Sequence, residues 1–422
     1  MCIRSRRAFI GTAVAAGVLA TACSRSEQKV SIPTLRDQAP DGSLLKAGLI
    51  GCGGRGKGAA LDFLSAGPNL QITALGDVFR DRLDDAHKTI QKEKDQTVSE
   101  DMCFVGFDAF QKVIDSGVDV VILATPPHFR PEHFAAAVAA GKHVFMEKPI
   151  AVDPVGAKSI IETAGQAKTK DLCAVTGTQR HHQKEYIETY RRIAEGAIGD
   201  IVAARCYWNQ SQLWYREQQE GWSDMEWMIR DWVDWCWLSG DHIVEQHVHN
   251  IDVINWFTGA HPFKAVGFGG RARRVTGDQY DYFSVDYTFE NDMHLHSMCR
   301  QIDGCAENVS EYIVGTKGSS NCSDTIYKPD GSIAWKFEGE KGKPYAQEHI
   351  DLVTAIRTSS PINEARNTAE STLVAIMGRI SAYTGRETTW QEMMDSNLRL
   401  GPTEYAMGPV KIDAVVPVAG KG

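Results

Sequence analysis

A short apolar strand that runs into a glycine-rich turn, Lys46-Ala-Gly-Leu-Ile-Gly-Cys-Gly-Gly-Arg-Gly-Lys-Gly58, constrains this chain more than any other stretch. Gly51, Gly53 and Gly56 have the G-x-G-x-x-G spacing of a dinucleotide-binding loop. Glycine at these positions permits the tight turn, the approach of a diphosphate to the backbone, and the packing of the next helix on the strand. The diphosphate would lie on N–H groups at the start of that helix. Alone, the spacing also fits a purely structural turn. The segments that follow are needed to distinguish a dinucleotide-binding loop from such a turn.

Those segments alternate between strand and helix patterns. Residues 70–77 alternate as a half-buried strand does, and residues 118–124 and 143–146 are apolar as buried parallel strands are. This alternation predicts a doubly wound parallel sheet, in which ligands bind beyond the carboxyl ends of the strands. The cofactor-binding residues predicted at that edge are Gly51, Gly53, Gly54, Arg55, Gly56, Asp77, Thr125, Pro126, Glu147 and Lys148.

Asp77 and Lys148 each have two interpretations. A carboxylate at the end of the second strand accepts a hydrogen bond from a ribose 2′-hydroxyl and repels a 2′-phosphate, so Asp77 favours NAD; otherwise it is a strand-end carboxylate that faces water. Arg80 is close enough in sequence to soften this preference, which keeps NADP open. Lys148 can donate to a substrate oxygen beside a nicotinamide, or it caps a strand at the surface.

Beyond about residue 165 the pattern changes to strands without long helices between them, at 202–207, 265–269, 283–289 and 295–300. This spacing predicts a largely antiparallel sheet. The predicted fold is therefore an α/β Rossmann domain with a doubly wound parallel sheet, followed by an α+β domain with a large, mostly antiparallel sheet. The predicted segments are a signal peptide (1–23), a linker (24–44), the Rossmann domain (45–165), the α+β domain (166–395) and a C-terminal tail (396–422).

Titratable side chains concentrate in Gly240-Asp-His-Ile-Val-Glu-Gln-His-Val-His-Asn-Ile-Asp252. In a continuous helix, His242, Glu245, His249 and Asp252 would share one face. That face is either a buried reactive site, a satisfied structural network or a metal site. Because the two histidines on it are two turns apart, they cannot readily bind one ion together, and no metal is predicted.

Composition and the N-terminus exclude several classes of protein. A formal net charge of −9 with interspersed signs argues against nucleic acid as a partner. No run beyond the N-terminus is long and apolar enough for a transmembrane span. Arg6-Arg7-Ala8-Phe9-Ile10 before a small-residue apolar segment predicts twin-arginine export, to the periplasm or beyond. Cleavage would either leave a lipid anchor at Cys23 or follow Ala22 without lipidation.

The chain resembles the Gfo/Idh/MocA oxidoreductases, the family of glucose–fructose oxidoreductase and inositol dehydrogenase, over about residues 46–390. The resemblance implies that Lys148 is the catalytic lysine and His249 the catalytic histidine. Glu245 stands where the family usually has aspartate, and Arg130 where many members have histidine. The motifs that carry the resemblance are Gly51-Cys-Gly-Gly-Arg-Gly56, Ala124-Thr-Pro126, Ala140-Gly-Lys-His-Val144, Glu147-Lys148-Pro149 and His249-x-x-Asp252.

The resemblance implies hydride transfer between a sugar carbon and a nicotinamide, with histidine as general base and lysine stabilising the developing alkoxide. The residues leave open which of the two takes the proton. Since the periplasm offers no pool of free cofactor, an exported enzyme would keep NAD(H) tightly bound and return the hydride. Two-substrate transfer, epimerisation and glycoside cleavage through a keto sugar all close that cycle. The alternatives of other classes are a non-catalytic sugar-binding protein on the same fold and a metal-dependent hydrolase.

The expected partner is a sugar or glycoside substrate. Five further side chains are candidates for binding it, each with a structural alternative. The tryptophan-rich stretch 208–237 suits stacking on sugar rings, but such a cluster more often forms a core or a subunit interface. The family resemblance also implies a homodimer or homotetramer. The five candidate substrate-binding residues are Arg180, His181, Trp232, His242 and Asp252.

Overall fold

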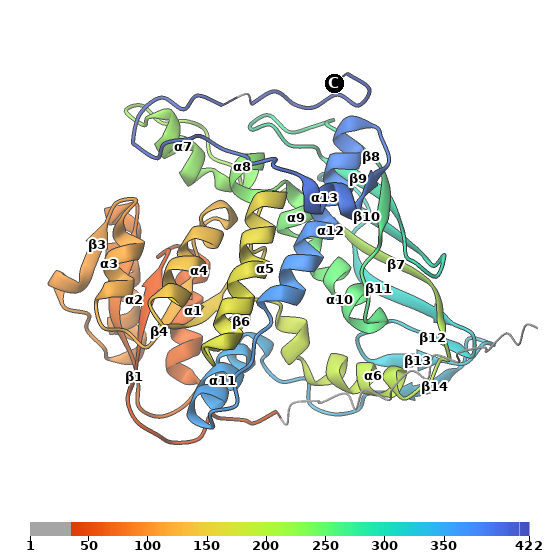
Figure 1. The fold of residues 1–422 in the computed structure, drawn as a ribbon, viewed down its shortest axis with the longest axis horizontal. Helices are drawn as coiled ribbons and strands as arrows, with labels where there is room; N and C mark the ends of the chain where they lie inside the picture. Colours follow the sequence, from red (N-terminus) through yellow and green to blue (C-terminus); the bar gives the residue numbers. More distant parts are fainter. Residues whose placement is uncertain (1–34, 413, 422) are drawn as a thin grey trace, which may run out of the picture. The chain divides into compact units, whose positions relative to one another are not determined.

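The computed structural model of the protein describes residues 35–412 and 414–421. The predicted signal peptide, its cleavage site at Cys23 and most of the predicted linker lie outside the described residues. Figure 1 shows the arrangement of the elements, with the parallel sheet and its helices in one half and the larger sheet in the other. None of the helices in the described ranges combines the length and apolar character needed to cross a membrane.

Six parallel strands form the first sheet, in the order β3-β2-β1-β4-β5-β6. They are short and apolar because helices cover both faces, as in other doubly wound sheets, and this part of the predicted fold is confirmed. The sixth strand lies beyond residue 165, so the sheet extends further along the chain than the expected domain boundary. The strands are β1 (Leu45–Ile50), β2 (Leu70–Asp77), β3 (Cys103–Val105), β4 (Val120–Leu123), β5 (His143–Met146) and β6 (Ala174–Thr176).

Two layers of helices bury the faces of this sheet. One layer packs around Phe63, Leu83 and Val353, and the other around Ile114, Phe134 and Ile160. The last helix of the first layer comes from near the end of the chain and returns to the parallel sheet. The first layer is α1 (Gly54–Ser65), α2 (Arg80–Lys94) and α11 (Pro344–Arg357), and the second is α3 (Ala109–Asp115), α4 (Arg130–Ala139) and α5 (Pro154–Thr169).

Nine strands form the second sheet, in the order β14-β13-β12-β11-β7-β10-β9-β8-β15. Among the described strands of this sheet, only β7 and β10 pair in parallel, so the predicted antiparallel character is confirmed. One face of the sheet packs against α10 (Val248–Thr258) and α12 (Ala365–Thr384), in a core that includes Val285, Leu295 and Leu373. The strands are β7 (Ile201–Gln210), β8 (Lys264–Gly270), β9 (Tyr282–Thr288), β10 (His294–Gln301), β11 (Asn308–Gly315), β12 (Gly318–Ser320), β13 (Thr325–Tyr327), β14 (Ile333–Lys336) and β15 (Thr388–Thr389).

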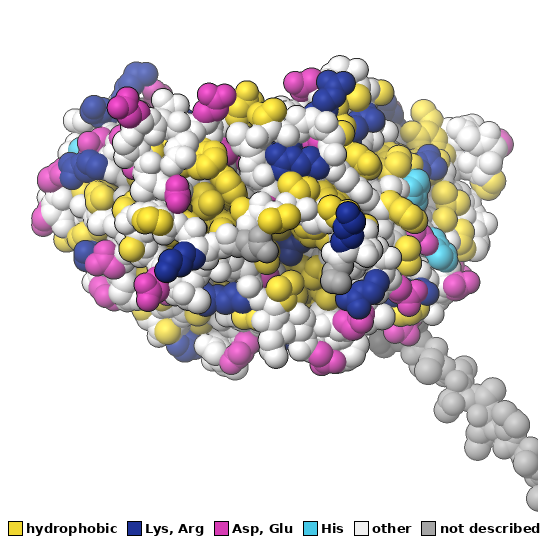
Figure 2. Space-filling model, turned by 90° about the horizontal axis from the view of Figure 1, so that it is seen from above, with side chains coloured by type: hydrophobic (Ala, Val, Ile, Leu, Met, Phe, Trp, Pro, Cys, Tyr) yellow, Lys and Arg dark blue, Asp and Glu magenta, His cyan; other side chains and the backbone are white. Residues whose placement is uncertain are grey.

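Short helices between β7 and β8, together with the end of the chain, lie over the carboxyl edge of the parallel sheet. They pack on it through an apolar cluster that includes Phe79, Phe129, Ile229 and Trp237. Figure 2 looks onto this side, where hydrophobic, Lys and Arg side chains are interspersed. The remaining helices are α6 (Lys184–Ala194), α7 (Asp224–Arg230), α8 (Cys236–Ser239), α9 (His242–Glu245), α10 (Val248–Thr258), α12 (Ala365–Thr384) and α13 (Trp390–Asp395), with 3-10 turns η1 (Glu100–Met102), η2 (Pro127–Phe129), η3 (Gln179–His182) and η4 (Trp232–Asp234).

Candidate functional site

The glycine loop joins β1 to α1 and lines a cavity of about 360 Å³. Gly51 has a φ of +94°, and a Cβ at Gly56 would lie 1.9 Å from the carbonyl oxygen of Gly51, so both positions require glycine. Among the described residues, no side chain caps the start of α1 and its first turn holds no acid. The free N–H groups of that turn therefore fit a diphosphate, as the spacing predicts.

Asp77 ends β2 and lines the same cavity. One carboxylate oxygen accepts from the Cys52 N–H at 2.6 Å and the other from the Phe79 N–H at 2.9 Å. Burial raises the pKa of this carboxyl group, and the two backbone hydrogen bonds oppose that effect. Each oxygen keeps further capacity to accept, so the arrangement fits a ribose hydroxyl.

The arginine that sequence reasoning placed near this carboxylate lies elsewhere. Arg80 donates to Asp84 at 2.8 Å and pairs with Glu100 on the exposed side of α2. Arg82, two residues further along the first turn of α2, lines the cavity instead. Arg82 is not among the residues predicted from the sequence, although positions half a helical turn apart are expected to face different sides of the helix.

Arg130 ties the other end of the cavity to the loop that carries Lys148. Its buried guanidinium donates to the carbonyl oxygens of Thr125 at 2.8 Å, Glu147 at 2.8 Å and Pro149 at 2.5 Å. Thr125 lines the cavity, so this single side chain holds the ends of two neighbouring strands together. The sequence had marked Arg130 only as a departure from the family pattern.

Arg55 and Glu147, both predicted to bind cofactor, bind each other. Nε of Arg55 lies 2.5 Å from Oε1 of Glu147, and the guanidinium is 3.7 Å from the buried carboxylate of Glu348 on α11. Arg55 also lines the cavity. The ion pair therefore joins the start of α1 to the end of β5, beneath the loop that presents Lys148.

Lys148 and Glu245 meet across the two domains. Nζ of Lys148 donates to the carbonyl oxygen of Glu245 at 2.5 Å and lies 3.3 Å from its Oε1. Burial and the charges of Lys148 and Arg180 hold the pKa of His249 well below its usual range, so the imidazole is neutral. The Trp208 ring stacks on His249 at 5.5 Å between centroids. A lysine donor and a neutral histidine acceptor therefore lie in one mostly buried region, close enough for the lysine charge to act on the imidazole.

The histidine-rich segment forms two helices rather than the continuous one considered from the sequence. α9 ends at Glu245 and α10 begins at Val248, so the four side chains do not share a single face. His242 hydrogen-bonds to Asp241 at 2.9 Å and lies against Phe283 in the core of the second domain. The helix break turns the Glu245 carbonyl toward Lys148.

The remaining predicted substrate-binding residues lie in different places. His181 and Asp252 bind each other at 2.6 Å and line a second cavity of about 290 Å³. Arg180 is paired with the buried Glu311 at 2.5 Å, and Trp232 lines the first cavity. Within the part of the chain that the structure describes, no three His, Cys, Asp or Glu side chains are grouped to hold a metal ion.

Two family models match this chain. A model described as "Oxidoreductase family, NAD-binding Rossmann fold" matches residues 45–176, and the GFO/IDH/MocA C-terminal domain matches residues 186–321. The first match ends with β6, at the end of the parallel sheet.

Three individual proteins that this chain resembles have between 21% and 27% sequence identity to it. An uncharacterized oxidoreductase of Streptococcus pneumoniae is 26% identical over 59% of this chain and 64% of that protein, so the match spans less than two thirds of its length. The scyllo-inositol 2-dehydrogenase (NADP(+)) of Bacillus subtilis is 27% identical over 60% of this chain and 79% of that protein. The crystal structure of scyllo-inositol dehydrogenase from Lactobacillus casei with NAD(H) and scyllo-inositol bound covers 82% of this chain and 99% of that one, with a TM-score of 0.61 and 21% identity. This last likeness shows the fold.

Proposed function

This chain belongs to the Gfo/Idh/MocA family of oxidoreductases, and from that premise we propose that it transfers hydride between a carbohydrate hydroxyl carbon and the nicotinamide of NAD(P). The observation that carries the proposal is the contact between Lys148 and Glu245 beside a neutral His249. Arg130 links this group to the end of the dinucleotide cavity through Thr125. A substrate carbon between the two would meet both the cofactor and the proton-handling groups.

Two residues of this chain would act on the substrate oxygen, one as a proton acceptor and one as a hydrogen-bond donor. Bound NAD(P) supplies the hydride acceptor or donor. Neutral His249 can accept the hydroxyl proton as general base, and the ammonium of Lys148 can donate a hydrogen bond that stabilises the alkoxide charge. The Trp208 ring stacks on the His249 imidazole and so helps to fix the orientation of that ring. The glycine loop and Asp77 would hold the diphosphate and the adenosine ribose.

The substrate class is a polyol ring, either a sugar, a glycoside or an inositol. Relatives named as scyllo-inositol dehydrogenases support the inositol. The half-buried cation–aromatic pair of Arg180 and Trp208, 5.8 Å apart, supports a ring that has both polar and apolar surface. Oxidation, epimerisation and cleavage through a keto sugar share the first hydride transfer. The same residues serve all three reactions.

Export and assembly complete the proposal. Arg6-Arg7 supports the twin-arginine route, with a cofactor loaded before export and kept afterwards. On the outer face of the large sheet, Val266, Phe268 and Tyr282 are exposed, Phe268 by 71%. An apolar sheet face of this kind supports pairing with a second copy. Cell fractionation and light scattering after size-exclusion chromatography test the two points separately.

Native mass spectrometry of the purified full chain, followed by denaturation and nucleotide identification, tests the proposed function. We expect NAD(H) or NADP(H) to be released, and its absorbance to change when the folded protein meets a panel of inositols, sugars and glycosides. A protein that releases no nicotinamide nucleotide and binds none when it is added would refute the proposal. A protein that binds sugar but never changes the cofactor's redox state would be the non-catalytic binder.

A further inference from the structure

The dinucleotide cavity has a second wall, and that wall comes from the other domain. Beside Gly53 and Asp77, the cavity is lined by Trp214, Arg216 and Trp232, which belong to the stretch between β7 and α8. These residues face the side of the cavity where β2 ends, which is the adenosine side of a Rossmann site. The segment 211–232, called here the covering segment, thus lies over a cofactor site that the Rossmann domain otherwise builds alone.

Two arginines face this part of the cavity without a carboxylate partner. Among the described residues, neither Arg82 nor Arg216 has an acidic oxygen within ion-pair distance, whereas Arg80 and Arg230 are each paired twice. A Cβ built on Gly53 would lie 3.1 Å from Nη1 of Arg82, so that guanidinium sits directly at the glycine loop. Two guanidinium groups from different domains, neither engaged in an ion pair within the described part of the chain, lie beside a phosphate-binding loop and can bind an anion.

The backbone of Arg216 is fixed, although its side chain is exposed toward the cavity. Its N–H donates to the carboxylate of Asp231 at 2.5 Å, and its carbonyl accepts from the Trp227 indole at 2.7 Å. The guanidinium lies 5.3 Å from the centroid of the Trp214 ring. These contacts hold Arg216 in place before any ligand arrives, which lowers the entropy lost on binding.

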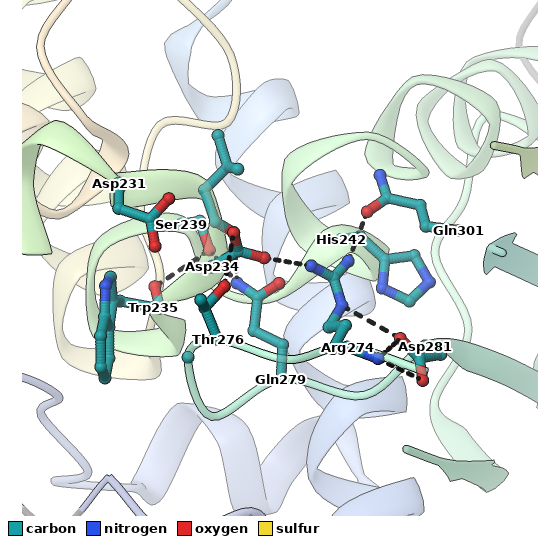
Figure 3. A network of polar contacts seen from close by, with 12 residues as sticks. Asp231, Asp234, Trp235, Ser239, His242, Arg274, Thr276, Gln279, Asp281 and Gln301 are labelled. Carbon is teal, nitrogen blue, oxygen red and sulfur yellow. Dashed lines mark hydrogen bonds and ion pairs between the residues drawn. The ribbon is translucent and has the colours of Figure 1, made fainter. Parts of the chain in front are cut away.

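A buried network anchors the end of the covering segment in the second domain. Figure 3 shows Arg274 between Asp234 and Asp281, with Gln301 bonded to the same guanidinium. Asp234 also donates its N–H to the carbonyl oxygen of Asp231 at 3.1 Å, so the network anchors the chain beside the carboxylate that accepts from the Arg216 N–H. The covering segment is therefore built into the core of the second domain.

A latch ties the covering segment to the Rossmann domain. The Arg230 guanidinium forms two hydrogen bonds to Asp81 at the start of α2, at 2.9 and 3.1 Å. It also lies over the Phe79 ring at 3.9 Å. The Arg230 contact therefore joins the covering segment to the first turn of α2, beside the end of β2.

We propose that the covering segment is the second half of the dinucleotide site, and that Arg82 and Arg216 together bind a phosphate group of the dinucleotide. The proposal rests on the proposed function for the identity of the ligand. The phosphate is either the 2′-phosphate of NADP or the diphosphate common to NAD and NADP. With the Arg230 latch closed, the segment also retains the cofactor, which is the property that an exported oxidoreductase needs.

Calorimetric titration of nucleotide-stripped full-length protein with NAD and with NADP tests this proposal. We expect Arg216→Gln and Arg82→Gln each to weaken binding at least about tenfold, and the double variant to lose less than the product of the two because both bind one phosphate. If affinity is lost for NADP alone, the two arginines bind the 2′-phosphate. If affinity falls equally for both nucleotides, they bind the diphosphate. Arg80→Gln, on the same helix but paired at the surface, is the matched control and should bind as the unchanged protein does.

Arg216→Gln that binds both nucleotides within twofold of the unchanged protein would overturn the proposal. If the unchanged protein binds neither nucleotide, the proposed function fails instead, so the two failures are distinguishable. Circular dichroism checks folding, and Arg216→Lys, which keeps the charge, should recover part of the affinity. Arg230→Gln tests the latch, with faster release of bound nucleotide expected in a stopped-flow chase and an unchanged release rate counting against retention.

Discussion

The Nζ of Lys148 lies 2.5 Å from the backbone carbonyl oxygen of Glu245, and this hydrogen bond joins the two domains at the candidate catalytic site. Because the acceptor is a backbone oxygen, the contact does not depend on the length of the residue-245 side chain. Glutamate in place of the family's usual aspartate therefore leaves the lysine anchored. The carboxylate, 3.3 Å away, remains available to interact with substrate.

Lys148→Met should stop cofactor reduction and leave nucleotide binding intact. The ammonium is the group that stabilises alkoxide charge, and the loss of one such donor lowers kcat by about 100- to 1,000-fold. Stopped-flow absorbance with a substrate found in the screen measures the reduction, and titration measures the binding. Lys168→Met, on the exposed side of α5, is the control. Turnover of Lys148→Met at the unchanged rate would rule out the role given to this lysine.

His249→Asn should lower kcat by about 100- to 10,000-fold, the range of a lost general base. The pH profile of the unchanged enzyme gives a second test. Burial and the charges of Lys148 and Arg180 hold the pKa of His249 well below 6.5, and the neutral form, which accepts the proton, persists at every pH above that lowered pKa. As pH falls through 6.5, kcat/KM should stay level. A decline centred there would contradict the assignment.

Asp231→Asn should stabilise the protein at neutral and alkaline pH. Burial and the neighbouring Asp234 raise the pKa of Asp231 to about 7 in the folded chain, against about 3.9 when unfolded. The folded state then loses stability as pH rises from about 4 to about 7, and asparagine removes that loss. After discounting for solvent screening, we expect a gain of about 2 kcal/mol above pH 7.

Thermal melts of Asp231→Asn from pH 4 to pH 8 measure this gain. The difference from the unchanged protein should be small at pH 4, grow up to pH 7 and then level off. Glu217→Gln, an exposed change in the same segment, should show no such trend. A constant difference at all pH values would mean that the titration of Asp231 is not its cause.

Arg274→Leu should cost about 3–5 kcal/mol of unfolding free energy, because it leaves the buried carboxylates of Asp234 and Asp281 without their cation (Figure 3). The surface pair of Arg366 and Glu370 is the control, since Arg366→Gln should cost less than about 1 kcal/mol. Urea denaturation measures both. Equal costs would show that the network adds nothing beyond an exposed pair.

Much of the fold can be predicted from local patterns of residues in the sequence. The glycine spacing, the strand that ends at Asp77 and the strands around Val285 and Leu295 are read from residues near one another in the chain, and the structure confirms the two sheets. The assignment of catalytic and cofactor roles to individual residues stays a prediction. The structure brings Lys148, Glu245 and His249 into one region and places His181 with Asp252 at a second cavity.

The sequence by itself determined that a dinucleotide loop exists and that a lysine follows the strand at 143–146, because turn geometry and strand burial depend on neighbouring residues. Only the tertiary structure decided that Arg82 lines the cavity while Arg80 forms surface ion pairs, since the two positions are about half a helical turn apart. It also decided that Arg216, far along the chain, shares the cavity with Arg82. Contacts between distant segments depend on how two domains pack, and no local pattern encodes that packing.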